Sequence, residues 1–180
     1  MKTGGYTGVI IFEGLNSESK IDFQKLLGKI QGCRVDKISD KAGVGVLVEG
    51  ELVARYFKKH DFYRFLEELK VDWQKILSKK LLPDYAVLVI ARETMYIIEV
   101  KSQQVDDSVY EELMLCDFKR KQYLKLVAPL GLKVEYVYVL SDWFKKPEYK
   151  DVLDYIHSVN CHYKFNELPL AWLGLPTKKA

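Results

Sequence analysis

Two acidic residues and a lysine stand in otherwise apolar stretches of the chain. Asp84 opens one apolar run, and Glu99 and Lys101 close the next one, which begins at Met95. Charged side chains are seldom buried in strands without a partner or a chemical task. Two carboxylates on paired strands can hold a divalent cation, and a lysine beside them can orient a water molecule. These residue types in this pattern indicate the hydrolysis of a phosphodiester bond.

The two apolar runs are predicted to be the paired strands of a β-hairpin, covered on both faces. Two registers are open. A turn centred on residues 92–93 places Asp84 opposite Lys101, and a turn centred on residues 91–92 places it opposite Glu99. In both registers the alternation of side chains sends all three charged residues to one face of the sheet. A slip of one residue or a β-bulge would separate them.

The tripeptide Glu-x-Lys carries little information by itself, because it also occurs at residues 18–20, 68–70 and 148–150. Those copies fall in helix-like or loop-like sequence, where solvated charges are expected. Only the copy at 99–101 ends an apolar strand and follows a Pro-Asp dipeptide at hairpin distance. A structural alternative is open, in which Asp84 only begins a strand and the other two charges form an ion pair at a strand end.

The Pro-Asp dipeptide at 83–84, the Glu-Val-Lys tripeptide at 99–101 and the helix predicted after them resemble the motif of the PD-(D/E)XK nuclease superfamily. This is the fold of many type II restriction endonucleases. The resemblance covers about residues 60–140. It implies an α/β fold, a mixed sheet flanked by helices, with a restriction-endonuclease-like α-β-β-β-α-β core. The second and third strands of that core would carry the site.

In that superfamily the Asp and the Glu bind Mg²⁺, and the Lys contacts the attacking water. The resemblance therefore implies that Asp84, Glu99 and the backbone carbonyl of Val100 hold Mg²⁺, for which Mn²⁺ is an expected substitute. It also implies that Lys101 orients the water. Mg²⁺ prefers oxygen ligands and keeps several waters, so that two carboxylates suffice to hold it.

The composition sets the outer bounds of the interpretation. The chain has 180 residues, of which 48% are hydrophobic and 29% charged, as in an ordinary globular protein. We expect a single nuclease domain over residues 1–180, because this length suits one domain with a proper core. The net charge of +3 permits a nucleic-acid partner without requiring one.

The cysteines and histidines give no metal signature. Cys33, Cys116 and Cys161 are an odd number without Cys-x-x-Cys spacing, so neither a disulfide framework nor a zinc site is indicated. His157 and His162 flank Cys161 without a further ligand nearby, and ordinary packing is expected. No apolar run reaches the ~18 residues of a membrane span, and no secretory leader is evident. We therefore expect a cytoplasmic protein without a membrane partner.

Hydrophobic periodicity predicts the elements that must position the charged residues. A tight turn at residues 49–51 is expected to join two of the strands. Strands are expected at 7–12, 33–38, 44–48, 52–57 and 132–140 in addition to the hairpin, and helices at 17–30, 61–79, 108–128 and 151–158.

Three further residues are candidates for a supplementary role at the site. Members of the superfamily often place another acid on the helix before the Asp strand, and Glu68 and Asp72 lie on one flank of that predicted helix. Gln103 falls on the same strand face as the catalytic lysine if the strand continues that far, where it could approach the metal or the phosphate. Solvated helix charges are the alternative for both acids.

Basic residues after the motif are candidates for contacts with the DNA backbone. Lys119, Arg120 and Lys121 lie in the second half of the predicted helix at 108–128, where they also complement the helix dipole. Lys145 and Lys146 lie in a loop rich in aromatic residues. Such a loop can stack on nucleic acid or pack against the core.

Together these features predict a Mg²⁺-dependent endodeoxyribonuclease of the type II restriction kind, acting on double-stranded DNA. Cutting two strands needs two sites, so a twofold homodimer is expected. The apolar C-terminal stretch at 168–175 is predicted to lie as an extended arm on an apolar surface, of the partner or of its own subunit. Alternatives are a junction-resolvase-like repair nuclease, the small subunit of a heterodimeric restriction enzyme, and a non-catalytic DNA-binding subunit.

Overall fold

The fold is built on a mixed β-sheet of seven strands. The computed structural model describes residues 8–12, 22–102 and 108–175. The strands lie in the order β2 (Cys33–Lys37), β3 (Val44–Val48), β4 (Glu51–Lys58), β5 (Tyr85–Val89), β6 (Thr94–Lys101), β7 (Lys133–Leu140) and β8 (His162–Phe165). The pairs from β2–β3 to β5–β6 are antiparallel, whereas β7 runs parallel to both β6 and β8.

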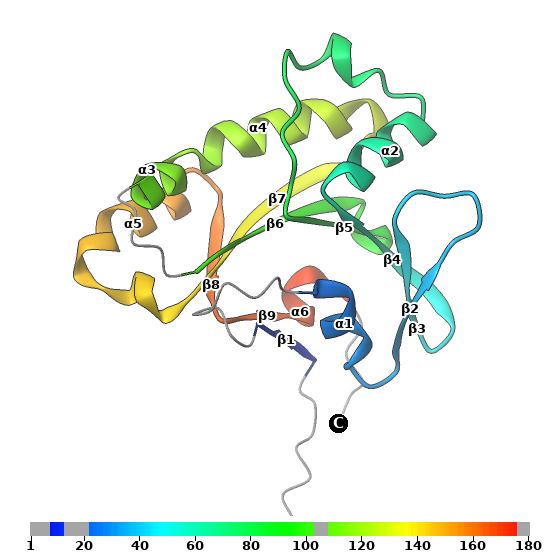
Figure 1. The fold of residues 1–180 in the computed structure, drawn as a ribbon, viewed down its shortest axis with the longest axis horizontal. Coiled ribbons are helices and arrows are strands. Elements are labelled where there is room, and N and C mark those ends of the chain that lie inside the picture. The colour runs from blue at the N-terminus through cyan, green and yellow to red at the C-terminus, as the bar shows by residue number, and fades with distance from the viewer. Residues whose placement is uncertain (1–7, 13–21, 103–107, 176–180) are drawn as a thin grey trace, which may run out of the picture.

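Helices cover one face of this sheet, and the two ends of the described chain cover the other (Figure 1). The first layer contains α2 (His60–Glu68), α3 (Ser108–Met114), α4 (Cys116–Val127) and α5 (Lys150–Ser158). The second layer contains β1 (Val9–Ile11), α1 (Phe23–Gly28), β9 (Glu167–Pro169) and α6 (Leu170–Leu173). A mixed sheet flanked by helices was predicted, and this α/β architecture is confirmed. No helix among the described residues is both long and apolar enough to cross a membrane.

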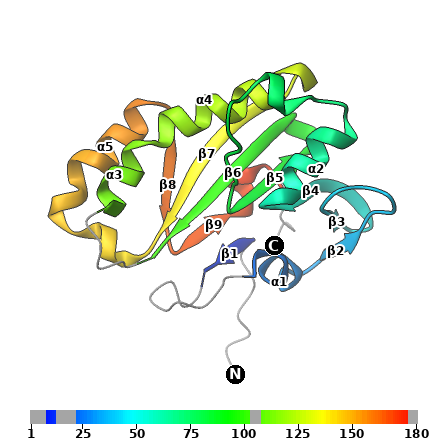
Figure 2. The ribbon, with the colours of Figure 1, turned by 45° about the horizontal axis from the view of Figure 1, so that its top comes forward.

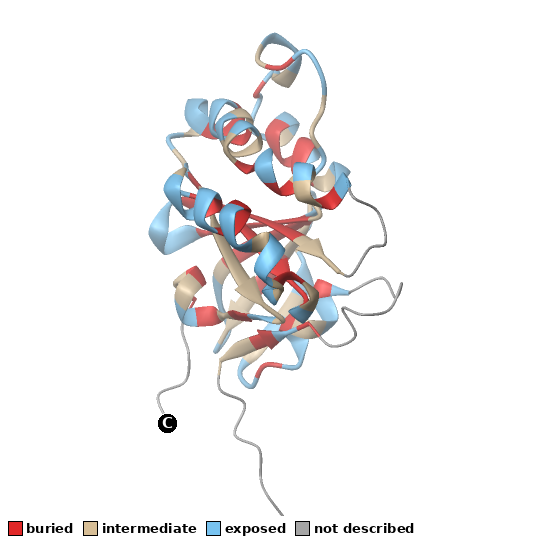
Figure 3. Ribbon diagram, turned by 90° about the vertical axis from the view of Figure 1, so that its left-hand side faces the viewer, coloured by how far each residue is buried: buried red, intermediate tan, exposed pale blue. Residues whose placement is uncertain are grey.

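The two central strands are buried on both faces, as their continuous apolar sequence predicts. Ala86 and Ile97 face the helices together with Phe57, whereas Val87 and Ile98 face the second layer. Figure 3 shows that buried positions gather between the layers and that exposed ones lie on the outer sides of the helices. The sheet therefore separates two apolar cores, one on each of its faces.

The hairpin of β5 and β6 adopts one of the two predicted registers. Tyr85 lies opposite Ile98, so the next pair along the ladder is Asp84 and Glu99. A short 3-10 turn at residues 90–92 followed by Glu93 in the left-handed region, with φ of 49°, closes the hairpin. The alternative register, with Asp84 opposite the lysine, is wrong.

The hairpin of β3 and β4 also agrees with the sequence. The strands predicted at 33–38, 44–48 and 52–57 are present with small changes in their ends. Glu49 and Gly50 both have positive φ, 52° and 86°, as the tight turn between β3 and β4 requires.

The helix predicted at 61–79 is wrong in length, because α2 ends at Glu68. Lys70 takes a positive φ of 61°. The N–H of Lys70 then donates to the carbonyl of Glu67, and the N–H of Val71 donates to that of Leu66. These two bonds form a Schellman motif, which terminates a helix. Glycine usually occupies the position of Lys70, so no residue there marks the end of the helix in the sequence.

The apolar residues beyond this point pack without continuing the helix. Trp73 lies in a short 3-10 turn at residues 73–75, with its ring edge-on to Tyr63. The hydroxyl of Tyr63 donates to the carbonyl of Leu81 and accepts from its N–H, both at 2.9 Å. This clamp fixes the path of the chain from α2 to β5.

The helix predicted at 108–128 is divided into α3 and α4 at Leu115, whose ψ of 1° departs from helical values. The break lets α3 pack against α5 while α4 lies along β7 (Figure 2). The predicted strand at 7–12 is present as β1, and within the described part of the helix predicted at 17–30 only residues 23–28 are helical, as α1.

The C-terminal stretch packs on its own chain, which settles the choice between the two predicted surfaces. β9 pairs antiparallel with β1, with Ile10 opposite Leu168. Leu168, Leu170 and Leu173 are all buried in the second core. The arm therefore supplies no separate support for a homodimer.

We predict that Leu173→Ala destabilises the protein strongly, because this side chain is fully buried in the second core. The free energy of unfolding should fall by about 2–5 kcal/mol, as is usual for Leu→Ala in a core. Urea unfolding followed by circular dichroism measures it. Ile11→Ala is the control, since Ile11 is 52% exposed and should change stability by no more than about 0.5 kcal/mol. Equal stability of the two variants would contradict the packing.

Candidate functional site

Three charged residues form a row across the ends of three neighbouring strands. Lys58 of β4 pairs with Tyr85 of β5, and Tyr85 pairs in turn with Ile98 of β6. The next positions along both ladders are therefore Lys59, Asp84 and Glu99. Because side chains alternate, this row points to the face that carries the helices.

Asp84 lies in the middle of the row with both carboxylate oxygens engaged. Its Oδ1 is 2.5 Å from the ammonium group of Lys59. Its Oδ2 accepts a hydrogen bond from the backbone N–H of Val100 at 3.1 Å. The carboxylate is therefore fixed between β4 and β6, although it lies just before the first residue of β5.

Glu99 is the acid that the fold buries, with a relative exposure of 5%. Burial, followed by the negative charge of Asp84, raises the pKa of Glu99 from 4.5 to about 7. The positive charges of Lys119, Lys101 and Lys59 oppose this shift. All five charged groups therefore act on one small volume at the helix-covered face of the sheet.

Lys101 also takes part in an ion pair. Its Nζ is 2.6 Å from Oε2 of Glu112, which projects from α3. The hydroxyl of Tyr138, on β7, donates to the backbone carbonyl of Glu112 at 3.2 Å. This contact anchors α3 to the sheet, so that Glu112 can hold the end of the Lys101 side chain.

Lys119 is the cation at the site that the structure leaves without an ion-pair partner among the described residues. It lies on α4 and is only partly exposed. Its neighbours on the helix behave differently, since Arg120 and Lys121 both pair with Asp117, at 3.5 and 2.6 Å. Of the three basic residues at positions 119–121, Lys119 is therefore the one that remains available to an anion.

The donor atoms that this site offers to a cation are oxygens. Asp84 and Glu99 supply carboxylate oxygens, and Val100 can add its carbonyl. The N–H and the C=O of a strand residue point to the same side, and the N–H of Val100 points to Asp84. Within the described ranges no cluster of three or more His, Cys, Asp or Glu side chains could hold a metal. An all-oxygen set with few protein ligands is nevertheless what Mg²⁺ uses when it keeps several waters.

Neither supplementary acid lies at the row of charges. Glu68 pairs with Arg55 at 3.0 Å and accepts the N–H of Ala42 at 2.9 Å. The hydrogen bond from Arg55 lowers the pKa of Glu68 to about 2. Lys59 precedes α2 and Glu68 ends it, so these residues are separated by a helix of nine residues, or about 13 Å. The structure therefore does not bring Glu68 to the row of charges.

Asp72 lies beyond the end of α2, in the segment that the prediction had made helical. Its carboxylate is 3.4 Å from Lys75 in a half-exposed pair. It therefore behaves as a solvated charge, and its prediction as a supplementary ligand has no structural support. Gln103 lies outside the described residues.

The aromatic loop after β7 packs against the core. Phe144 is fully buried, and the indole N–H of Trp143 donates to the hydroxyl of Tyr149 at 3.2 Å. Lys145 pairs with Asp142 at 2.7 Å, and the ammonium of Lys146 lies 3.0 Å from the centre of the Trp143 ring. Packing was one of the two readings left open for this loop, and it is the one observed.

The histidines near the third cysteine have separate surroundings. The ring of His157 lies 4.6 Å from that of Tyr163, and His162 contacts Glu135 at 2.9 Å. Cys161 is buried. These three residues therefore form no common ligand set in the structure.

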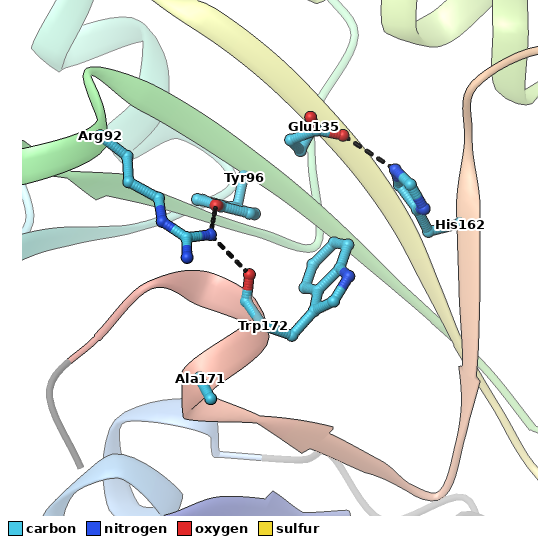
Figure 4. A pocket seen from close by; sticks show the side chains of 6 residues that line it. All are labelled: Arg92, Tyr96, Glu135, His162, Ala171 and Trp172. Carbon is cyan, nitrogen blue, oxygen red and sulfur yellow. Dashed lines mark hydrogen bonds and ion pairs between the residues drawn. The ribbon is translucent and has the colours of Figure 1, made fainter.

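A hollow of about 300 Å³ lies on the opposite face of the sheet (Figure 4). Arg92 donates from one nitrogen to the hydroxyl of Tyr96 at 2.9 Å and to the carbonyl of Trp172 at 3.0 Å. Glu135 and His162 bond to each other across the same hollow. The polar groups here largely satisfy one another, whereas those of the Asp84 site include an unpaired cation and a buried acid.

Lys59 and Glu112 are the site residues that sequence reasoning missed. Lys59 lies in no motif and enters the site only through the pairing of β4 with β5. Glu112 is one of two adjacent glutamates in the helix predicted at 108–128, and no motif distinguishes it from its neighbour. Knowledge of the strand pairing would have found Lys59, because it follows β4 directly.

Comparison of the chain with protein-family models, with curated proteins and with solved structures found no match. The function is therefore argued from the site itself.

We predict that Glu99 makes the stability of the protein depend on pH. The pKa of such an acid is higher in the folded state than in the unfolded state. Its contribution to stability is complete below the unfolded-state pKa and is lost as pH rises through the folded-state pKa. The relevant window runs from 4.5 to about 7. Over it, wild type should lose up to about 3 kcal/mol relative to Glu99→Gln.

Urea unfolding in EDTA at about pH 5 and about pH 8 measures this difference. Glu51→Gln, at an exposed strand end, is the matched control and should follow the wild type. If the stability of Glu99→Gln changes with pH as that of the wild type does, the pKa of the Glu99 carboxyl group is not raised.

Proposed function

We propose that the protein is a Mg²⁺-dependent endonuclease of the PD-(D/E)XK type that hydrolyses phosphodiester bonds in double-stranded DNA. One observation carries the proposal. The Asp84 carboxylate, the buried Glu99 and Lys101 come together on one face of two paired strands, in the register that places the two acids opposite each other. A structural ion pair alone would not require a second acid beside a buried one, because that arrangement costs stability.

The residues divide the work as follows. Asp84, Glu99 and the carbonyl of Val100 would hold Mg²⁺, which supplies a bound water of lowered pKa and neutralises charge on the phosphate. Lys101 orients the attacking water through its ammonium N–H groups, and Glu112 holds that ammonium in place. Lys119 binds a non-bridging phosphate oxygen, since it has no carboxylate partner of its own in the described structure.

The arrangement of the strands supports the family assignment. Three antiparallel strands, β4, β5 and β6, are followed by helices and by β7 parallel to β6. This order agrees with the later part of the α-β-β-β-α-β core that the resemblance implies. The chain departs from that core in placing α2 between β4 and β5. Lys59 lies at the junction of β4 and this helix.

Restriction of duplex DNA is the role that we favour, in a twofold homodimer with one site for each strand. A junction-resolvase-like nuclease would use the same site with a preference for branched DNA. A small subunit of a heterodimeric enzyme would nick one strand, and a non-catalytic subunit would bind without cutting. Digestion of plasmid and branched substrates, together with light scattering of the free protein, separates these four roles.

We predict that Asp84→Asn and Glu99→Gln each abolish Mg²⁺-dependent cleavage of a supercoiled plasmid while the fold is kept. Each substitution removes a charged ligand of the cation but preserves the shape of the side chain. Asp72→Asn is the control, because it removes an equal charge from a half-exposed acid away from the row of charges. Either site variant cutting at near the wild-type rate would rule out the assignment.

We predict that Lys119→Met weakens the binding of duplex DNA of every sequence. The slope of log K against log salt should fall by about 1, the change expected when one phosphate contact is lost. Binding is measured in the Asp84→Asn background, which prevents cleavage. Lys125→Met is the matched control, since Lys125 is exposed on another side of the same helix. An unchanged salt slope would remove Lys119 from the phosphate site.

A further inference from the structure

Lys59 occupies the place where a positive charge acts most directly on the acid pair. It follows the last residue of β4, and the pairing of Lys58 with Tyr85 leaves it opposite Asp84. Its ammonium is 2.5 Å from Oδ1 of that carboxylate. It is also one of the three lysines whose charge favours the ionised form of Glu99. Lys59 therefore neutralises the same carboxylates that would bind a divalent cation.

The backbone of Lys59 is unusual for a residue with a side chain. Its φ is 49° and its ψ is −115°, and α2 begins at the next residue. These angles match the first central position of a type II′ turn, where glycine is preferred. Its side chain makes no capping bond to the helix. Glycine would therefore adopt these backbone angles more easily than lysine does. The lysine adds a contact with Asp84 that glycine could not make.

The ion pair between Lys59 and Asp84 is weak enough for another cation to replace Lys59. The side chain of Lys59 is 46% exposed, and that of Asp84 is 26% exposed. Ion pairs with this much solvent contact are weak, and the lysine stem is long and flexible. The bond from Val100 N–H to the other carboxylate oxygen is independent of Lys59, so Asp84 keeps its place when Lys59 leaves.

We propose that Lys59 is a built-in counter-ion of the acid pair, which competes with a divalent cation for Asp84 and turns to a DNA phosphate once the cation has taken the carboxylate. This inference rests on the proposed nuclease function and assigns to that site a further positioning residue. The protein then keeps its acid pair neutralised while no cation is bound. It also delivers a second lysine to the DNA phosphates in the loaded state, beside Lys119.

The test is the affinity for Mn²⁺, measured by isothermal titration calorimetry without DNA at about pH 8.5, above the pKa of Glu99. Lys59→Met should bind Mn²⁺ about tenfold more tightly than the wild type, because a competing unit charge is gone. Lys58→Met is the matched control. It makes the same change in net charge at the preceding, exposed residue, and its Kd should stay within about twofold of the wild-type value.

A second measurement follows Lys59 to the DNA. Duplex binding is compared with and without Ca²⁺ at constant ionic strength, with cleavage absent. The wild type should gain more affinity on adding Ca²⁺ than Lys59→Met does, because only the wild type has a lysine to release. An equal gain in both proteins would overturn the transfer of Lys59 to the phosphate.

The outcomes of these measurements distinguish a failure of the counter-ion role from a failure of the proposed nuclease function. If the wild type and Lys59→Met bind Mn²⁺ equally well, the counter-ion role is wrong and the nuclease proposal stands. If no variant binds Mn²⁺, both are wrong. Lys59→Gly provides a second variant that suits the backbone angles of this position, so that poor folding of Lys59→Met does not prevent the measurement. It too should bind Mn²⁺ more tightly.

Discussion

The burial of Glu99 next to Asp84 is the constraint on which the site depends. Removing a carboxylate from water is costly, and a second carboxylate beside it raises the cost further. The strand register makes this proximity unavoidable, because the two acids lie opposite each other at the end of the β5–β6 ladder. The raised pKa of Glu99 has the same cause, because burial and the charge of Asp84 both disfavour its ionised form. Every other charged group at the site can be understood as a response to it.

The helical layer supplies that response. Lys59 precedes α2, Glu112 lies on α3 and Lys119 on α4, so three helices bring charges to one place on the sheet. The far end of α2 is held by the Glu68 ion pair with Arg55. That contact lies away from the row of charges, and it holds the helix that begins beside Asp84. Glu68, which was first considered as a metal ligand, therefore acts by holding α2 in position.

The sequence was most informative where the periodicity was strong and least informative where the structure depends on distant contacts. The two central strands and their charged residues were predictable from an apolar run broken by three charges. The register stayed open, because a turn containing Glu93 in the left-handed region carries no glycine to reveal it. The end of α2 was hidden in the same way by Lys70. Lys59 was not predictable, since its role follows from a strand pairing.

The balance of charge at the site can be compared with the charges of the ligands that the proposed function requires. In the structure three carboxylates face three ammonium groups, so the site is close to neutral. A bound divalent cation would leave an excess of two positive charges. A phosphodiester and a hydroxide ion each carry one negative charge, and together they would restore the balance. This balance agrees with the function that we propose, in which a cation, a nucleophile and a phosphate meet at the site. The groups in this balance are Asp84, Glu99, Glu112, Lys59, Lys101 and Lys119.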